Sequence, residues 1–192
     1  MPLILASASP RRTELLRNAD IDFTVDPAHL TERPFPSEKP LEYAKRLACE
    51  KARAVFATHP DSAVLGADTV VVVDEHLLEK PADEGDAARM LRLLSGRTHQ
   101  VITGVCLAAP GFEQTEAEVT QVTFSVLSEA EIDYYVQTGE PMDKAGAYAI
   151  QGIASRWVER IDGCYFNVVG LPLPRVYRIL RMAEAATGAS LL

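Results

Sequence analysis

The sequence predicts a layered α/β fold. Short apolar runs that are typical of buried strands alternate with segments whose apolar residues recur every three or four positions, as in amphipathic helices. Gly, Pro and Ser punctuate the boundaries between these segments. No internal repeat or low-complexity segment interrupts the alternation. We therefore expect one domain over residues 1–192, organised as two lobes that share a sheet.

The first half of the chain supplies two strands and three helices. The apolar run Leu3–Leu5 is typical of a buried strand, and Pro10 after it favours a first helical turn because its ring presets the backbone. Residues 41–57 have helical apolar periodicity, and the nearly all-apolar run Ala63–Val73 is typical of a strand covered on both faces. A helix over residues 86–94 ends at a Ser-Gly pair.

The second half begins with two strands separated by a Pro-Gly turn, over residues 101–108 and 118–127. Ser128 and Glu131 have the spacing of a capping box, which opens a helix that ends at Gly139. The last two expected elements are a strand near residues 157–161 and an amphipathic helix over about residues 175–186.

Composition excludes several classes of protein. The chain is 47% hydrophobic and has a formal net charge of −8 at pH 7, which repels nucleic acid polymers and anionic membranes. No apolar run approaches the roughly 20 residues that span a bilayer. The apolar start lacks the basic residues of an export signal, so we expect a cytoplasmic protein. Its three cysteines and four histidines show no metal-ligand spacing, and reduced thiols are expected.

The segment from Ser7 to Arg12 is a candidate anion site. Free N–H groups of a first helical turn, two hydroxyls and two guanidinium groups converge there on a volume that suits phosphate. The alternative is a surface helix with basic residues near its start, although cations are unfavourable at that end of a helix dipole. The candidate phosphate-binding residues are Ser7, Ser9, Arg11 and Arg12.

Asp68 breaks the apolar pattern of its strand. A buried carboxylate is costly unless it is paired, metal-bound or catalytic, so Asp68 is either a general base or metal ligand, or an acid satisfied by backbone N–H groups or an arginine. Gly66 would let a ligand approach the backbone closely. Thr69 can share a role with Asp68 only if the strand ends or kinks there, because successive side chains face opposite sides.

Three lysines and one glutamine also stand in suggestive contexts. Lys51 lies on the apolar face of its predicted helix, where it either extends to the edge of that face or contacts a phosphate. The proline after Lys80 holds that residue extended. Lys144 and Gln151 lie in the small-residue segment 141–152, which is either a ligand-wrapping loop or a mobile linker. The Gln151 amide can both accept from and donate to a uracil-type ring.

A divalent metal fits the same set of residues. The arginines and lysines above number about as many as the positive partners that a triphosphate needs, and a metal can replace some of them. Glu32 and Asp68 are the candidate ligands, because hard oxygens suit Mg or Mn. Glu32 is a lone acid in a Pro-rich loop, for which the alternative is a solvated side chain.

In their order along nearly the full chain, these segments resemble the Maf family of nucleoside triphosphate pyrophosphatases. One departure is Ala149, where the family usually has Gly. The motifs that carry the resemblance are Ser7-Ala8-Ser9-Pro10-Arg11-Arg12, Glu50-Lys51-Ala52, Gly66-Ala67-Asp68-Thr69, Lys80-Pro81, Leu94-Ser95-Gly96-Arg97-Thr98-His99, Asp143-Lys144-Ala145-Gly146-Ala147-Tyr148, Ile150-Gln151-Gly152 and Val169-Gly170-Leu171-Pro172.

The resemblance implies an elongated α/β fold similar to that of inosine triphosphatase, in which helices flank a mixed sheet and a central cleft separates two lobes. It also implies a divalent metal cofactor and cleavage of a nucleoside triphosphate between its α and β phosphates. Asp68 matches the proton acceptor. Arg11 or Arg12, Thr69 and Gln151 match positions that tune substrate choice. The pattern looks like the branch that acts on dTTP and UTP, with modified pyrimidine triphosphates as further possible substrates.

Two rival functions stay open at this stage. A nucleotide-sensing module that regulates cell division would need the anion pocket but not Asp68. A pyrophosphatase for purine or damaged nucleotides would need both. Family members commonly form homodimers, although no feature of this sequence predicts one.

Overall fold

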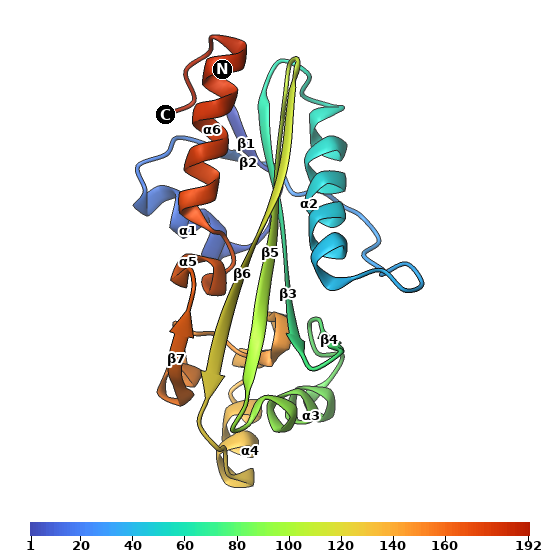
Figure 1. The fold of residues 1–192 in the computed structure, drawn as a ribbon, viewed down its shortest axis with the longest axis vertical. Coiled ribbons are helices and arrows are strands. Elements are labelled where there is room, and N and C mark those ends of the chain that lie inside the picture. The colour runs from blue at the N-terminus through green and yellow to red at the C-terminus, as the bar shows by residue number, and fades with distance from the viewer. The chain divides into compact units, whose positions relative to one another are not determined.

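The computed structural model describes residues 1–192 and contains a seven-stranded mixed sheet with helices against it (Figure 1). The strands are β1 (Leu3–Leu5), β2 (Thr24–Val25), β3 (Ala63–Val73), β4 (His76–Leu78), β5 (Thr98–Ala109), β6 (Phe112–Phe124) and β7 (Val158–Asp162). Their order is β2-β1-β3-β5-β6-β7, with β4 paired to β3. β1 runs parallel to β2 and β3, whereas β4 and β7 run antiparallel to their neighbours. The predicted α/β class is confirmed.

The helices follow the predicted alternation. They are α1 (Pro10–Asn18), α2 (Pro40–Phe56), α3 (Glu84–Leu94), α4 (Glu129–Gln137), α5 (Tyr165–Val169) and α6 (Leu173–Thr187), with short 3₁₀ helices η1 (Glu140–Asp143), η2 (Ala145–Ala147) and η3 (Ile153–Trp157). The capping box predicted for α4 is present: the Ser128 hydroxyl accepts from the Glu131 amide, and the Glu131 carboxylate accepts from Ser128. None of the helices is long and apolar enough to cross a membrane.

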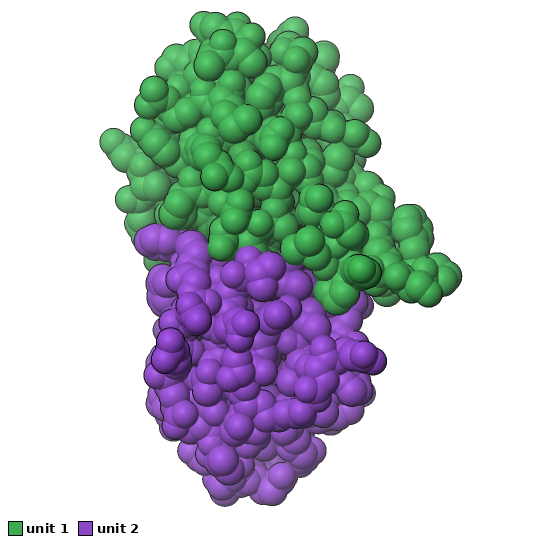
Figure 2. Space-filling view, viewed as in Figure 1, with its two compact units in different colours: residues 1–68, 103–118, 170–192 green, residues 69–102, 119–169 purple.

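The chain divides into two compact units (Figure 2). Unit 1 comprises Met1–Asp68, Thr103–Glu118 and Gly170–Leu192, and unit 2 comprises Thr69–Ile102 and Val119–Val169. The long strands β3, β5 and β6 each contribute residues to both units. The organisation expected for residues 1–192, a single domain of two lobes, stays a prediction.

Within unit 1, two glycines let the backbone of α2 lie directly on the sheet. A Cβ added at Gly66 would lie 2.1 Å from the carbonyl oxygen of Ala48, and one added at Gly104 would lie 2.2 Å from that of Ala44. The expectation that Gly66 admits a ligand is therefore wrong, because the space beside it is filled by helix backbone. This close approach also fixes the position of α2, the helix that carries Lys51.

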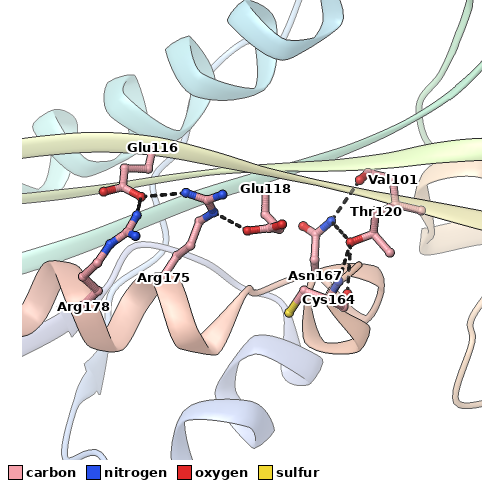
Figure 3. Close-up of polar contacts among 8 residues, drawn as sticks. All are labelled: Val101, Glu116, Glu118, Thr120, Cys164, Asn167, Arg175 and Arg178. Atoms are coloured by element: carbon pink, nitrogen blue, oxygen red, sulfur yellow. Dashed lines mark hydrogen bonds and ion pairs between the residues drawn. The ribbon is translucent and has the colours of Figure 1, made fainter. Parts of the chain in front are cut away.

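The structure corrects the bounds of two strands. β5 begins at Thr98 rather than at residue 101, and β6 spans Phe112–Phe124 rather than residues 118–127. The early residues of β6 are mostly polar and half-buried. Glu116 and Glu118 on this stretch form ion pairs with Arg175 of α6, and Glu116 also pairs with Arg178 (Figure 3). These polar residues hid the start of the strand from sequence analysis, and their ion pairs hold α6 against β6.

In unit 2, a buried network fixes the turn between β7 and α5 (Figure 3). The Asn167 amide donates to the Val101 carbonyl oxygen at 2.9 Å and to the Thr120 hydroxyl at 3.0 Å. The same hydroxyl accepts from the Cys164 amide at 3.0 Å. β2, β4 and α5 were not predicted because two to five residues are too few to display a period.

Candidate active site

Unit 1 contains a charged centre around Lys51 of α2, which contacts Asp68 of β3 and Glu32 of the loop between β2 and α2; Lys51 and Asp68 are buried, whereas Glu32 is exposed. The Lys51 ammonium lies 2.7 Å from Oδ1 of Asp68 and 2.7 Å from Oε1 of Glu32. Lys51 is buried, so it does not extend to the edge of the apolar face. The predicted metal ligands Glu32 and Asp68 are thus brought together around one cation, and Glu32 is not simply a solvated acid.

The environment of Asp68 combines burial with opposite charge. Burial raises the pKa of Asp68, and the nearby charges of Lys51 and Arg12 offset part of that increase. The Glu32 carboxylate adds to the increase because two like charges resist joint ionisation. A carboxylate with a raised pKa accepts protons more readily, which is the property required of a general base.

Arg12 lies beside this centre and is held by unit 1 itself. Its Nε donates to the Gly170 carbonyl oxygen at 2.8 Å, and its Nη1 donates to the Ser7 hydroxyl at 3.0 Å and to the Ala67 carbonyl oxygen at 2.9 Å. Burial lowers the pKa of Arg12, while Asp68 opposes that change. The guanidinium therefore fixes the chain next to Asp68 and places a positive charge close to it.

The start of α1 has the predicted form. The helix begins at Pro10, Ser9 is its N-cap, and the Ser9 side chain makes no capping hydrogen bond to the helix. The Ser9 amide donates to the Ser7 hydroxyl at 3.3 Å, so Ser7 joins this turn to Arg12. Arg11 is half-buried on the same first turn. Ser7, Ser9 and Arg12 thus meet at one turn, and the anion-binding role of Ser7, Ser9, Arg11 and Arg12 stays a prediction.

The remaining predicted site residues belong to unit 2. Lys80 and Gln151 are exposed, and Lys144 donates to the Glu140 carbonyl oxygen at 2.6 Å and to Oδ1 of Asp143 at 2.5 Å. β3 continues without interruption through Asp68 and Thr69. The strand end that a shared role for these two residues would require is therefore absent, and Thr69 is half-buried.

The loop that carries Gln151 is fixed on both sides by side chains that the sequence analysis did not identify. Tyr135 accepts from the Ala149 amide at 3.2 Å and donates to Oε1 of Glu140 at 2.9 Å. Glu140 in turn accepts from the Ile153 amide at 3.2 Å. A Cβ added at Gly152 would lie 2.0 Å from Oε1 of Glu140, so a larger residue there would displace this carboxylate. The loop is therefore packed and is not a mobile linker.

Tyr148 anchors the same loop from within. It is buried, and its hydroxyl lies 2.8 Å from Nε2 of His99. Both rings pack edge to face against Phe124. His99 is thus a structural residue that holds the loop in place. Ala149 does not have a positive φ, so alanine causes no backbone strain at this position.

The fold and unit 1 together describe an α/β protein in which a buried acid, the lysine that it contacts and an arginine lie beside the first turn of a helix. The chain belongs to the Maf family, since the family profile described as Maf-like protein matches residues 2–183. The protein named dTTP/UTP pyrophosphatase in Koribacter versatilis is 62% identical over 183 residues, which cover 95% of each chain. Proteins of the same name are 53% identical in Symbiobacterium thermophilum, over 93% of this chain and 92% of that one, and in Syntrophomonas wolfei, over 92% and 94%.

Proposed function

We propose that this protein is a nucleoside triphosphate pyrophosphatase that hydrolyses dTTP and UTP to the monophosphate and pyrophosphate. Relatives with that printed name match more than nine-tenths of the chain at 62% and 53% identity. The observation that carries the proposal is the contact of Lys51 with both Asp68 and Glu32 at 2.7 Å. The contact supports the proposal because the acid proposed as the base, a cation and a second acid meet at one centre, in which Lys51 and Asp68 are buried.

A divalent metal, Mg or Mn, is the proposed cofactor. The donor set fits it, because Asp68 and Glu32 offer two hard oxygens that already share one cation. These two carboxylates would hold the ion. When bound, it would offset the charge of phosphate oxygens and make water more acidic.

The protein's own groups then have separate tasks. Asp68 accepts the proton of the attacking water as the water oxygen bonds to phosphorus and pyrophosphate leaves with the electrons of the broken anhydride bond. Lys51 and Arg12 stabilise the charge that develops. The hydroxyls and amides at the start of α1, with Arg11, bind phosphate oxygens.

The unit 2 residues complete the proposal. Lys80 and Lys144 are proposed contacts of the phosphate chain, and Gln151 is proposed to recognise the pyrimidine ring. Glu140 and Tyr135 support this role by holding the Gln151 loop in one conformation. A homodimer, which is common in the family, and a cytoplasmic location, which the sequence analysis expects, are proposed with them and are tested by light scattering and cell fractionation.

The decisive experiment measures pyrophosphate release from a panel of pyrimidine and purine nucleoside triphosphates, with Mg, Mn or a chelator. We expect metal-dependent release that is fastest with dTTP and UTP. Binding of nucleotide without turnover would instead identify a sensing module. Turnover that is fastest with purine or damaged nucleotides would reassign the substrate class.

A further inference from the structure

Unit 1 holds a second cluster of metal-ligating groups, which widely separated sequence positions concealed. Cys49 of α2, Cys106 of β5 and Glu113 of β6 each present one ligand atom, and the three atoms lie within 4.8 Å of one another. Two of the cysteines, which show no metal-ligand spacing in the sequence, are thus brought close together by the fold. None of the three cysteines is in a disulfide.

The spacing of these atoms suits one ion. Zinc–sulfur bonds of about 2.3 Å in a tetrahedral site place two sulfur ligands roughly 3.8 Å apart. The three ligand atoms lie within 4.8 Å of one another, so a bound ion would draw them closer together. Cys106 is buried, whereas Cys49 is half-buried and Glu113 exposed, so the cluster has an inner end and an open end.

Arg53 orients the carboxylate of this cluster. Its Nε lies 2.7 Å from Oε2 of Glu113, and its Nη2 lies 2.6 Å from Oε1. Oε1 is also the atom that faces the Cys49 sulfur, at 3.9 Å. Such an outer partner fixes a ligating carboxylate in metal sites. The charges also balance, because two thiolates and one carboxylate are neutralised by a divalent ion and the guanidinium.

We propose that Cys49, Cys106 and Glu113 form a binding site for a thiophilic divalent ion such as Zn²⁺ or Cd²⁺. Its ligand set differs from that of the Asp68 and Glu32 centre. Soft thiolates select such ions, whereas Mg and Mn prefer the all-oxygen pair. Binding releases the two thiol protons to solvent, since only thiolates ligate the metal. The thiolate site therefore favours Zn²⁺ or Cd²⁺, and the Asp68 and Glu32 centre favours Mg or Mn.

The test uses the reduced full-length protein and Cd²⁺ as the probe. We expect one equivalent of Cd²⁺ to bind with a thiolate-to-cadmium charge-transfer absorption, and excess Mg²⁺ not to reverse it. Cys49→Ser and Cys106→Ala should each abolish the band, and circular dichroism checks that both variants fold. Arg53→Gln should weaken binding by roughly 10–100-fold, the usual effect of removing an outer partner.

Two matched variants make the result specific. Cys164→Ser removes the third thiol, which is not in the cluster, and should leave the band intact. Asp68→Asn should also leave it intact, so a failure of this site and a failure of the proposed pyrophosphatase are distinguishable. Absence of the band, or its survival in both Cys49→Ser and Cys106→Ala, would overturn the proposal.

Discussion

The ammonium of Lys51 lies 2.7 Å from Oδ1 of Asp68, and both side chains are buried. Such a pair is costly to take out of water unless each charge keeps its partner. The second acid, Glu32, contacts the same ammonium at 2.7 Å, and the charge of Arg12 acts on both acids. Two carboxylates and two cations therefore meet in one cluster, and the carboxylate oxygens are the groups proposed to hold a metal ion.

Asp68→Asn should lower kcat for dTTP by at least ~10²-fold, the usual contribution of a general base. The amide has the same shape, so circular dichroism should show an unchanged fold. Asp61→Asn, which alters an exposed acid just before β3, is the matched control and should retain full activity. Near-normal turnover of the Asp68 variant would remove this residue from the chemistry.

Lys51→Met should move the acid limb of the pH–rate profile to higher pH. Lys51 lowers the pKa of Asp68 in opposition to burial, so its loss raises that pKa further. Because the base must be ionised, activity is then lost at a higher pH as the solution is acidified. The measurement is kcat/KM for dTTP against pH, with Lys45→Met of the same helix as the control. An unmoved acid limb would contradict the coupling of these residues.

Gln151→Ala should reduce discrimination between UTP and CTP by about tenfold, equivalent to one lost hydrogen bond of about 1.4 kcal/mol. Turnover of a triphosphate that does not use the amide should change little. The comparison of kcat/KM across the triphosphate panel measures this, and Gln137→Ala at the end of α4 serves as the control. If the preference among bases is unchanged, Gln151 does not recognise the base.

Stability should fall on acidification because of His99. Burial lowers the pKa of His99 to about 4. The imidazole of the unfolded chain therefore binds a proton as pH falls through about 6.5, whereas that of the folded protein does so only near pH 4. The free energy of unfolding decreases as pH falls between these two values. The contribution amounts to about 2 kcal/mol between pH 7 and 5.

Urea unfolding of the wild type and of His99→Gln at pH 7 and pH 5 measures that difference. The variant should show a smaller loss of stability between the two pH values, because it lacks the buried imidazole. The exposed His76→Gln variant controls for removal of an imidazole from the surface. Equal pH dependence of the wild type and the His99 variant would exclude this histidine as the cause.

Local features of the fold were predictable from the sequence. The start of α1 at Pro10 and the Ser128 capping box depend on residues a few positions apart. The continuous apolar run of β3 predicts by itself that this strand is buried. Asp68 was identified as a site residue for the same reason, since a charge within an apolar strand is visible without knowledge of its partners.

Long-range contacts were decided only by the tertiary structure. Sequence could not reveal that Glu32 shares the Lys51 ammonium with Asp68, or that Gly66 makes room for helix backbone. The sequence also could not show that Cys49 lies close to Cys106. The sequence by itself determined the elements, their order and the residue types available for phosphate chemistry, because those follow from neighbouring residues. Which charges meet was decided by packing, because contact between distant residues depends on how the helices lie on the sheet.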